Sequence, residues 1–396
     1  MGEITRHPYK TREEWLSLRN SFEDRLGGSE LGVAAGHSHY SSPYAMFCEK
    51  VHLYEPEDIS EKEAIVQGHD LESYVAERFT RLTGKKVHEE LCIFTNSDAP
   101  HLKASIDRKI DDEDSGLECK TVKDIVMRKF PQGDFPQTYY DQCACYLKVT
   151  ELKRWYLAML VFGTSFKVFL MTTVKSEEER YSYLKAKVVG DEVLTDDEAI
   201  EWEKNYSYLE SCYYIGQEEL DGCEIVAANF MSRVEYFNNG NQDAWPVDEI
   251  DGSQATANAL AKVNPKALPS SVVTFDSSSE YGIQNDGNVY VGVKREDVLA
   301  IATRRGEIVQ LTKELEQEMD VLDNQMTALM RDKETFNIPG WKITNKNATP
   351  KKYASVSKIE EYFKAKKEDI PEGFITLSEP KRSIRFWPHK AKAKNE

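Results

Sequence analysis

The sequence predicts an α/β fold in which a mixed central sheet is flanked by helices, followed by a helical C-terminal extension. Between residues 60 and 174, a helical pattern, a hairpin pattern, a second helical pattern and two strand patterns follow one another, an order typical of an α/β core. Residues 296–336 carry one long amphipathic pattern, which predicts the extension. At 396 residues, the chain has room for two or three domains with buried cores.

The first helix of this core is predicted over residues 60–83. Ser60 has the residue type of an N-cap, Glu63 would complete a capping box, and Gly84 would end the helix. The face predicted to point inward carries, at spacings of three or four, Ile65, Gly68, Glu72, Val75, Phe79 and Leu82. Because a buried, unpaired carboxylate is costly, Glu72 needs a partner: a metal ion, a cationic part of a substrate, or an arginine such as Arg78.

A β-hairpin is predicted next, over residues 103–122, with the acidic, glycine-closed stretch 111–116 as its turn. Side chains alternate along a strand, so Glu118 and Lys120 share one face. Folding the hairpin about the centre of its turn places Asp107 nearly opposite Glu118. The hairpin therefore brings two carboxylates and one ammonium group together.

This combination is typical of metal-dependent phosphodiester hydrolysis. Asp107, Glu118 and the Cys119 carbonyl are predicted to bind one divalent cation. Glu72 and Asp107 would bind a second ion, Mg²⁺ being expected at both sites with Mn²⁺ as an alternative. The Lys120 ammonium would hold or deprotonate the attacking water. The competing interpretation is that Glu118 and Lys120 form only an ion pair on an exposed strand.

A second helix is predicted over residues 135–148, followed by strands at 154–162 and 166–174. Gln142 lies in this helix, one turn before Tyr146. Its amide is predicted to hydrogen-bond the scissile phosphate or the attacking water. The alternative is a solvated polar residue on a half-exposed helix.

These motifs, in this order, resemble the PD-(D/E)xK nuclease superfamily, with its restriction-endonuclease-like core, and within it the YqaJ-type viral recombinases, relatives of phage lambda exonuclease. The stretch EWLSLRNSFEDRLGGSELGVAAG, residues 14–36, is similar to the W-x-x-x-R and GGS segment of that family. The matching motifs that follow are GHDLE (68–72), SID (105–107), LECK (117–120) and YYDQ (139–142). Further along, DGSQATANAL (251–260) and GWKITNK (340–346) are similar to downstream segments of such proteins.

The resemblance implies where DNA is held. Arg19 and Ser29 occupy the positions implied to bind DNA phosphate, and Ser105 belongs to the implied DNA-binding set. The gap between Arg19 and Ser29 is longer than in the family pattern, which makes Arg25 a rival for the phosphate-contacting arginine. Ser29 would also suit the cap of the following helix, whose first amides favour a phosphate.

The resemblance also implies a reaction: a 5′-to-3′ exonuclease acting on linear double-stranded DNA and leaving 3′ single-stranded overhangs for phage-type homologous recombination. It implies a homotrimeric ring around the DNA, a single-strand annealing protein as partner, and a phage or prophage origin in the cytoplasm of a bacterial host. Two alternatives stay open. One is a catalytically silent DNA-end-binding or assembly factor with the same fold. The other is an endonuclease of the same superfamily, although no helix-turn-helix or zinc motif accompanies the basic tail.

Composition excludes several other classes of protein. No run approaches the roughly 18 apolar residues of a membrane span, and the N-terminus lacks the apolar segment of a signal peptide. Seven cysteines without a C-x-x-C pair argue against a disulfide framework, a zinc ribbon or an iron–sulfur nuclease. The net charge of −17 is spread unevenly: residues 177–253 carry 20 acidic and 5 basic side chains, whereas residues 342–396 carry 7 and 14. DNA affinity depends on such local basic groups rather than on the total.

Five segments are predicted along the chain: a nuclease core (1–176), an acidic helical extension (177–237) that is helical through 181–214, a linker-like excursion with one short helix (238–295), a long amphipathic helix (296–337) and a basic C-terminal segment (338–396). The apolar face of the long helix, from Ile308 to Leu329, would pack either within the chain or against a partner helix. The basic segment would follow duplex phosphates, with Phe386 and Trp387 as stacking groups, or be a solvated terminus.

Overall fold

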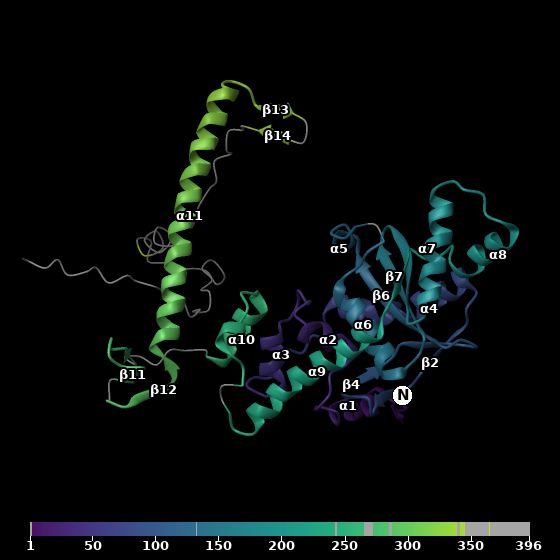
Figure 1. Cartoon of the computed structure of the whole chain (residues 1–396), viewed down its shortest axis with the longest axis horizontal. Coiled ribbons are helices and arrows are strands. Elements are labelled where there is room, and N and C mark those ends of the chain that lie inside the picture. Colours follow the sequence, from purple (N-terminus) through teal and green to yellow (C-terminus); the bar gives the residue numbers. More distant parts are fainter. Residues whose placement is uncertain are drawn as a thin grey trace, which may run out of the picture. The chain divides into compact units, whose positions relative to one another are not determined.

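The computed structural model describes residues 2–131, 133–241, 244–264, 272–284, 287–338, 341–344 and 364 (Figure 1). It divides into two compact units, residues 1–265 and 266–396. The finer division into five segments stays a prediction. Among the described residues, no helix combines the length and apolar character needed to cross a membrane.

The centre of the first unit is a six-stranded mixed sheet. Its strands, in spatial order, are β2 (Val87–Glu89), β5 (Arg108–Ile110), β6 (Ser115–Lys123), β7 (Arg154–Phe162), β8 (Ser165–Thr172) and β9 (Ser211–Tyr214). The pairs β6–β7 and β8–β9 are parallel, whereas the other neighbours are antiparallel. The predicted α/β core with a mixed sheet is therefore confirmed.

Helices cover both faces of this sheet. Helix α6 (Gln137–Thr150) connects the parallel strands β6 and β7 and packs on the face that carries Trp155, Leu157 and Met159. Helix α4 (Glu63–Thr83) packs on the other face, where Val75 and Phe79 meet Leu117 and Cys119. Because Leu117 and Cys119 belong to the α4 side, Glu118 and Lys120 are turned toward α6, as the alternation along the strand predicts.

A second, three-stranded sheet contains β1 (Ile4–Pro8), β3 (Cys92–Asn96) and β4 (Ala99–Ser105) in the order β1-β3-β4. The prediction of one continuous strand over residues 103–110 is wrong. This stretch is divided between β4 in this sheet and β5 in the central sheet. The chain leaves one sheet at Ser105 and joins the other at Arg108, so Asp107 lies in the crossing and its side chain is free to accept a backbone hydrogen bond.

Helix α4 ends as predicted but begins later. Gly84 adopts the left-handed conformation (φ 74°) that closes a helix, since it has no Cβ. The predicted N-cap at Ser60 is wrong: the helix starts at Glu63, and the Ser60 amide instead donates to Asp58. Ile65 and Leu82, predicted to point inward, are exposed, because the buried part of the helix is confined to Val75, Ala76 and Phe79.

The first unit also contains four short helices among its described residues. Three precede α4, namely α1 (Arg12–Asn20), α2 (Gly28–Ala34) and α3 (Pro43–Lys50), and α5 (Asp124–Met127) follows β6. The predicted helical stretch 181–214 is only partly correct. It contains α7 (Lys175–Val189) and α8 (Asp196–Asn205), but ends in β9, which adds an edge strand parallel to β8. Helix α9 (Gln217–Asn238) and the short 3₁₀ helix Val247–Glu249 follow.

The predicted short helix near residue 254 is confirmed as α10 (Gln254–Val263). It packs on α3, where the buried Thr256 hydroxyl donates to Ser42 at 2.7 Å. The second unit holds β10 (Val273–Thr274), β11 (Tyr281–Gln284), β12 (Val289–Lys294), helix α11 (Arg295–Met330) and the hairpin β13 (Thr335–Ile338) to β14 (Trp341–Thr344). The predicted long helix thus ends six residues early, since residues 335–336 belong to a strand. Apart from Lys364, the basic tail after residue 344 lies outside the described residues.

Candidate active site

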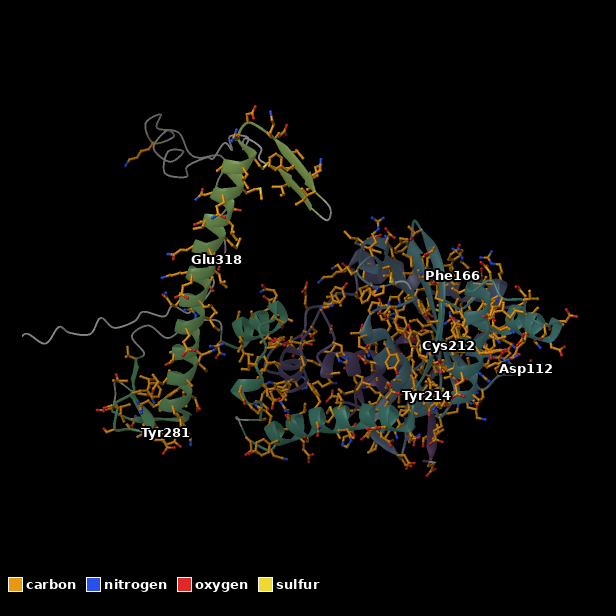
Figure 2. The ribbon with its side chains drawn as sticks, turned by 45° about the horizontal axis from the view of Figure 1, so that its top comes forward. Asp112, Phe166, Cys212, Tyr214, Tyr281 and Glu318 are labelled. Carbon is orange, nitrogen blue, oxygen red and sulfur yellow. The ribbon has the colours of Figure 1, made fainter. Side chains whose placement is uncertain are left out.

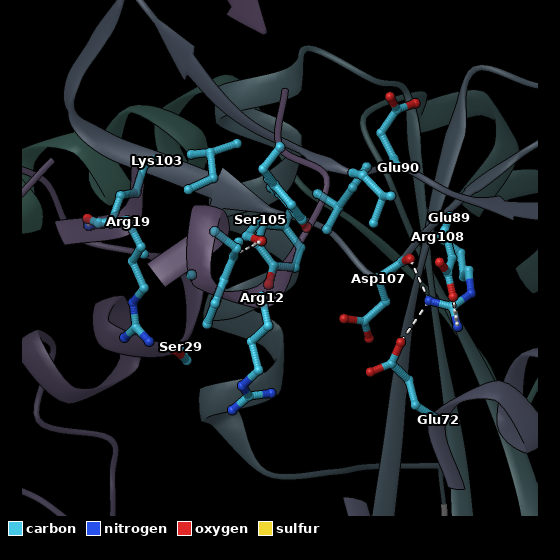
Figure 3. Close-up of a pocket in the computed structure, with 18 of the residues that line it drawn as sticks. Arg12, Arg19, Ser29, Glu72, Glu89, Glu90, Lys103, Ser105, Asp107 and Arg108 are labelled. Carbon is cyan, nitrogen blue, oxygen red and sulfur yellow. Dashed lines mark hydrogen bonds and ion pairs between the residues drawn. The ribbon is translucent and has the colours of Figure 1, made fainter. Parts of the chain in front are cut away.

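A cleft opens between the N-terminal helices, α4 and the hairpin of β5 and β6. Its larger part has a volume of about 1020 Å³ and is lined by the predicted residues Arg19, Ser29, Glu72, Asp107, Glu118, Cys119, Lys120 and Gln142. An adjoining part of about 490 Å³ shares Arg19, Ser29, Glu72 and Asp107 and adds Ser105 (Figure 3). Of the predicted site residues, Arg25 lines neither part.

Asp107 is held by the neighbouring strand. Its Oδ2 accepts a hydrogen bond from the Cys119 amide at 2.8 Å. Since the N–H and C=O of one strand residue point to the same edge, the Cys119 carbonyl is directed to the same side as Asp107. Burial, together with the negative charges of Glu118 and Glu72, raises the pKa of the Asp107 carboxyl well above its ordinary value. Such crowding of carboxylates favours a bound cation, which would relieve the repulsion.

Glu118 projects from β6 into the interior, and its side chain is only 2% exposed. Its Oε1 accepts hydrogen bonds from the Lys120 ammonium and, at 2.8 Å, from Gln142 Nε2. Its Oε2 has no hydrogen-bond partner within the described part of the protein. A buried carboxylate oxygen without a partner is costly, so this atom is suited to binding a ligand such as a metal ion.

Lys120 lies beside Glu118 with its ammonium 5.4 Å from the centre of the Tyr139 ring. Burial opposes the charged form of Lys120, but the Glu118 and Asp107 carboxylates outweigh it and raise the pKa of the ammonium. Lys120 is therefore protonated at neutral pH. The predicted ion pair with Glu118 exists, but it is buried in the cleft rather than exposed on a strand.

Gln142 lies on the buried face of α6, which corrects the alternative of a half-exposed, solvated residue. Its amide nitrogen donates to Glu118 and also to the Tyr146 hydroxyl at 2.7 Å. These two bonds use both N–H groups of the amide, and the carbonyl oxygen remains available as an acceptor. Gln142 thus fixes the orientation of Glu118 from the opposite wall of the cleft.

Glu72 has an arginine partner, but it is Arg108 rather than Arg78. The Arg108 guanidinium, 8% exposed, lies 2.6 Å from Glu72 and 3.3 Å from Glu89 and also donates to the Asp107 carbonyl, as Figure 3 shows. Arg78 instead stacks over the Phe166 ring at 4.7 Å. Sequence reasoning missed Arg108, although its position directly after Asp107 was a signal that a cation would lie near the carboxylates.

The residues present suit one hard divalent cation better than two. Asp107 and Glu118 offer carboxylate oxygens, including the unpartnered Oε2, and the Cys119 carbonyl is directed to the same region. Across the described ranges, no group of three or more His, Cys, Asp or Glu side chains is arranged to hold a metal. A second ion at Glu72 would require this carboxylate to loosen its ion pair with Arg108.

The predicted phosphate-binding residues lie at the other end of the cleft. The Arg19 guanidinium is 5.4 Å from the Trp15 ring, and the Trp15 indole donates to Ser105 at 3.0 Å. Arg25 lies over the Phe22 ring at 5.7 Å, outside the cleft. Of the two rival arginines, only Arg19 lines the cleft together with Ser29, which favours Arg19 for the phosphate.

Ser29 does not cap the following helix. The N-cap of α2 is Gly27, whose amide donates to Glu30 at 2.7 Å, and Ser29 is the second residue of the helix. Gly28 is required here because a Cβ at this position would lie 2.7 Å from the Tyr146 ring. The GGS motif thus allows α2 to approach α6 closely, and it leaves the Ser29 hydroxyl in the cleft.

Lys103 is a cleft residue that sequence reasoning missed. Its buried ammonium donates to the carbonyls of Arg19 (3.0 Å) and Phe22 (2.8 Å), so it anchors the end of α1 on β4. Burial is the largest cause that lowers the pKa of Lys103 to about 8. The sequence places Lys103 with His101 and Ser105 on the polar side of the alternation, and alternation alone does not show that this side is covered.

We expect Lys103 to make stability depend on pH. Its pKa is about 8 in the folded protein against an ordinary 10.5, so between these values the unfolded chain binds more protons, and the folded state gains stability as the pH rises. Over this window, the free energy of unfolding of the wild type should rise relative to that of Lys103→Met by as much as about 3 kcal/mol. Chemical denaturation of both proteins below pH 8 and near pH 10.5 measures it. If the wild type gains no stability relative to Lys103→Met as the pH rises, the lowered pKa of Lys103 is wrong.

Comparison with known proteins finds one family model that matches part of the first unit. Residues 14–153 match the YqaJ-like viral recombinase domain. The Bacillus subtilis (strain 168) protein named "Uncharacterized protein YqaJ" is 29% identical over 165 residues, which cover 41% of this chain and 50% of that protein. The chain thus spans about half the length of the curated relative it matches. The resemblance inferred from the ordered motifs is confirmed.

Two solved structures are also similar. One is an alkaline exonuclease (LHK-Exo) from Laribacter hongkongensis, with a TM-score of 0.35 and 16% identity. The other is the same exonuclease in complex with dAMP, with a TM-score of 0.36 and 14% identity. Each comparison covers 57% of this chain and 96% of the solved chain.

Proposed function

We propose that this chain, whose residues 14–153 match the YqaJ-like viral recombinase domain, is a metal-dependent deoxyribonuclease that degrades one strand of linear double-stranded DNA from its 5′ end. The product is a duplex with a 3′ single-stranded overhang, ready for homologous recombination. The observation that carries the proposal is the meeting of Asp107, Glu118, Lys120 and Gln142 in one cleft, with Glu118 Oε2 buried and unpartnered.

The metal would be Mg²⁺, with Mn²⁺ as a substitute. Asp107, Glu118 and the Cys119 carbonyl would hold one ion, and Glu72 with Asp107 would hold a second once Glu72 loosens its ion pair with Arg108. Bound there, the metal supplies Lewis-acid stabilisation of the charge that develops on the phosphate oxygens.

The protein's own residues divide the remaining work. Lys120, whose ammonium donates to Glu118, would hold the attacking water by a hydrogen bond or take its proton. Gln142 keeps Glu118 in position, and its carbonyl would accept a hydrogen bond from the water. Donating to the scissile phosphate would require its amide to release Glu118 or Tyr146. Arg19, Ser29 and Ser105, at the far end of the cleft, would bind the terminal phosphate of the strand being degraded.

The proposal extends to the oligomeric assembly of the protein. A trimeric ring around the duplex would retain a protein of net charge −17 on DNA, because enclosure replaces part of the electrostatic attraction. A single-strand annealing protein would receive the overhang. The two rival functions make different predictions: a silent end-binding factor would leave linear DNA intact, and an endonuclease would cut closed circles. Incubation of the protein with linear duplex and with closed circles, in Mg²⁺ and in EDTA, distinguishes all three.

Glu72→Gln is expected to raise the Mg²⁺ concentration needed for half-maximal activity. The substitution keeps the shape of the side chain but removes the charge that attracts a cation, and metal affinity depends on the number of charged ligands. A titration of the initial rate against Mg²⁺ measures the shift, with Glu89→Gln as the control, because Glu89 also contacts Arg108 but has no assigned metal. An unchanged titration would leave Glu72 as a partner of Arg108 alone.

A further inference from the structure

Helix α11 carries a row of apolar side chains that repeats every seven residues. The row consists of Ile301, Ile308, Leu315, Leu322 and Leu329. All five are exposed, from 48% for Ile308 to 68% for Leu329. Sequence alone left open whether this face packs within the chain, and in the described part of the protein no segment covers it. Figure 2 shows side chains projecting from this helix along its length, with Glu318 labelled near the middle.

A second row completes the pattern of a coiled coil. Three residues before each member of the first row stand Val298, Arg305, Thr312, Met319 and Met326. Two residues after the first four members stand only polar, uncharged residues: Thr303, Gln310, Gln317 and Asn324. The two apolar-rich rows take the a and d positions of a heptad, and the polar row takes the outward position. The first row is apolar at all five positions, whereas Arg305 and Thr312 interrupt the second, and the two rows together span more than four heptads.

The charges of α11 decide the orientation of an identical partner. In a parallel pair, Arg305 would face the partner's Arg305 within the core. Glu318 and Asp323 take the g and e positions that border the two rows. In a parallel pair, a g residue contacts the partner's e residue five positions later, so Glu318 would lie beside the partner's Asp323. Both contacts repel, and the second occurs twice.

An antiparallel pair removes these repulsions. With Val298 opposite the partner's Leu329, each residue of one row meets a residue of the other row, so Arg305 lies against the partner's Leu322 and Met319 against the partner's Ile308. The aliphatic stem of Arg305 can cover the leucine while its guanidinium reaches solvent. The arrangement is self-complementary, as a two-fold interface requires.

We propose that α11 pairs with α11 of a second copy of this chain in an antiparallel coiled coil along these two rows. The seam runs from Val298 to Leu329, about 47 Å at 1.5 Å per residue. This pairing is independent of any assembly by the first unit. It would double the number of chains in whatever assembly the nuclease domains form, so that a trimeric ring would become a pair of rings.

The mass of the full-length protein tests the pairing. Light scattering on the double variant Leu315→Glu/Leu322→Glu should give half the wild-type mass. The matched control Gln317→Glu/Asn324→Glu adds the same charge on the outward face and should keep the wild-type mass. With a trimeric first unit, the wild type would give six chains of 45.4 kDa and the seam variant three. If Leu315→Glu/Leu322→Glu has the same mass as the wild type, the proposal is overturned. The two rows would then be covered by another segment of the same chain or left uncovered.

Cysteine cross-linking tests the orientation without disturbing the fold. The seven native cysteines are buried, so the background is low. Under mild oxidation, Val298→Cys/Leu329→Cys should form covalent dimers, because these positions face each other only in the antiparallel pair. Leu329→Cys alone should remain monomeric on a denaturing gel. Efficient dimer formation by Leu329→Cys alone, or none by the double variant, would contradict the antiparallel arrangement.

Discussion

Glu118→Gln and Lys120→Ala are each expected to slow the hydrolysis of linear duplex DNA by about 100-fold or more. Glu118→Gln keeps the volume of a buried side chain and one acceptor for Gln142, but it removes the charge that the unpartnered Oε2 offers to a metal. Lys120→Ala removes the donor that we propose holds the attacking water. DNA binding should survive in both variants, because neither residue belongs to the phosphate-binding end of the cleft.

Initial rates on labelled duplex, together with a gel-shift assay, measure these two effects separately. Lys123→Ala is the matched control, since Lys123 is an exposed lysine at the end of the same strand. It should cleave at the wild-type rate. If either cleft variant is folded by circular dichroism and digests DNA nearly as fast as the wild type, the assignment of the catalytic residues is wrong.

The second large effect is expected at Arg19. If Arg19 binds the terminal phosphate, the wild type should degrade 5′-phosphorylated duplex about 10 to 100 times faster than dephosphorylated duplex, the range for one charge-assisted hydrogen bond. Arg19→Ala should remove this preference by slowing only the reaction on the phosphorylated substrate. Arg25→Ala should retain it, because Arg25 lies over Phe22 and outside the cleft.

The comparison of the two arginine variants on the two substrates gives four rates. Equal rates of the wild type on both substrates would remove the phosphate anchor from the account. A preference lost in Arg25→Ala and kept in Arg19→Ala would reverse the assignment, in favour of the rival that the spacing of the motif suggests.

The sequence predicted the relation between Asp107 and β6 because a hairpin is a local structure. Once the turn lies within residues 111–116, the register follows, and the structure pairs Arg108 with Leu117. Asp107 then falls next to Glu118 and Cys119, as observed in its hydrogen bond to the Cys119 amide. The alternation of side chains also predicted that Glu118 and Lys120 face one side.

The partners that come from distant segments were not predictable in the same way. Arg108 reaches Glu72 across 36 positions of sequence, and Lys103 reaches the carbonyls of α1 across more than 80. A strand pattern also gives no sign of the point where a chain leaves one sheet for another, so the break at Asp107 was missed. The Ser60 N-cap is wrong for a local reason: the Ser60 amide, which a capping box would give to Glu63, donates to Asp58, and the helix starts at Glu63.

The most direct test of the central claim is the digestion of one linear duplex labelled separately at its 5′ and 3′ ends, beside a closed circle of the same sequence. We predict that in Mg²⁺ the 5′ label is released first, the 3′-labelled strand persists as single-stranded DNA, and the closed circle stays intact. EDTA or Glu118→Gln should stop the reaction. Early release of the 3′ label, cutting of the circle, or equal digestion in EDTA would contradict it.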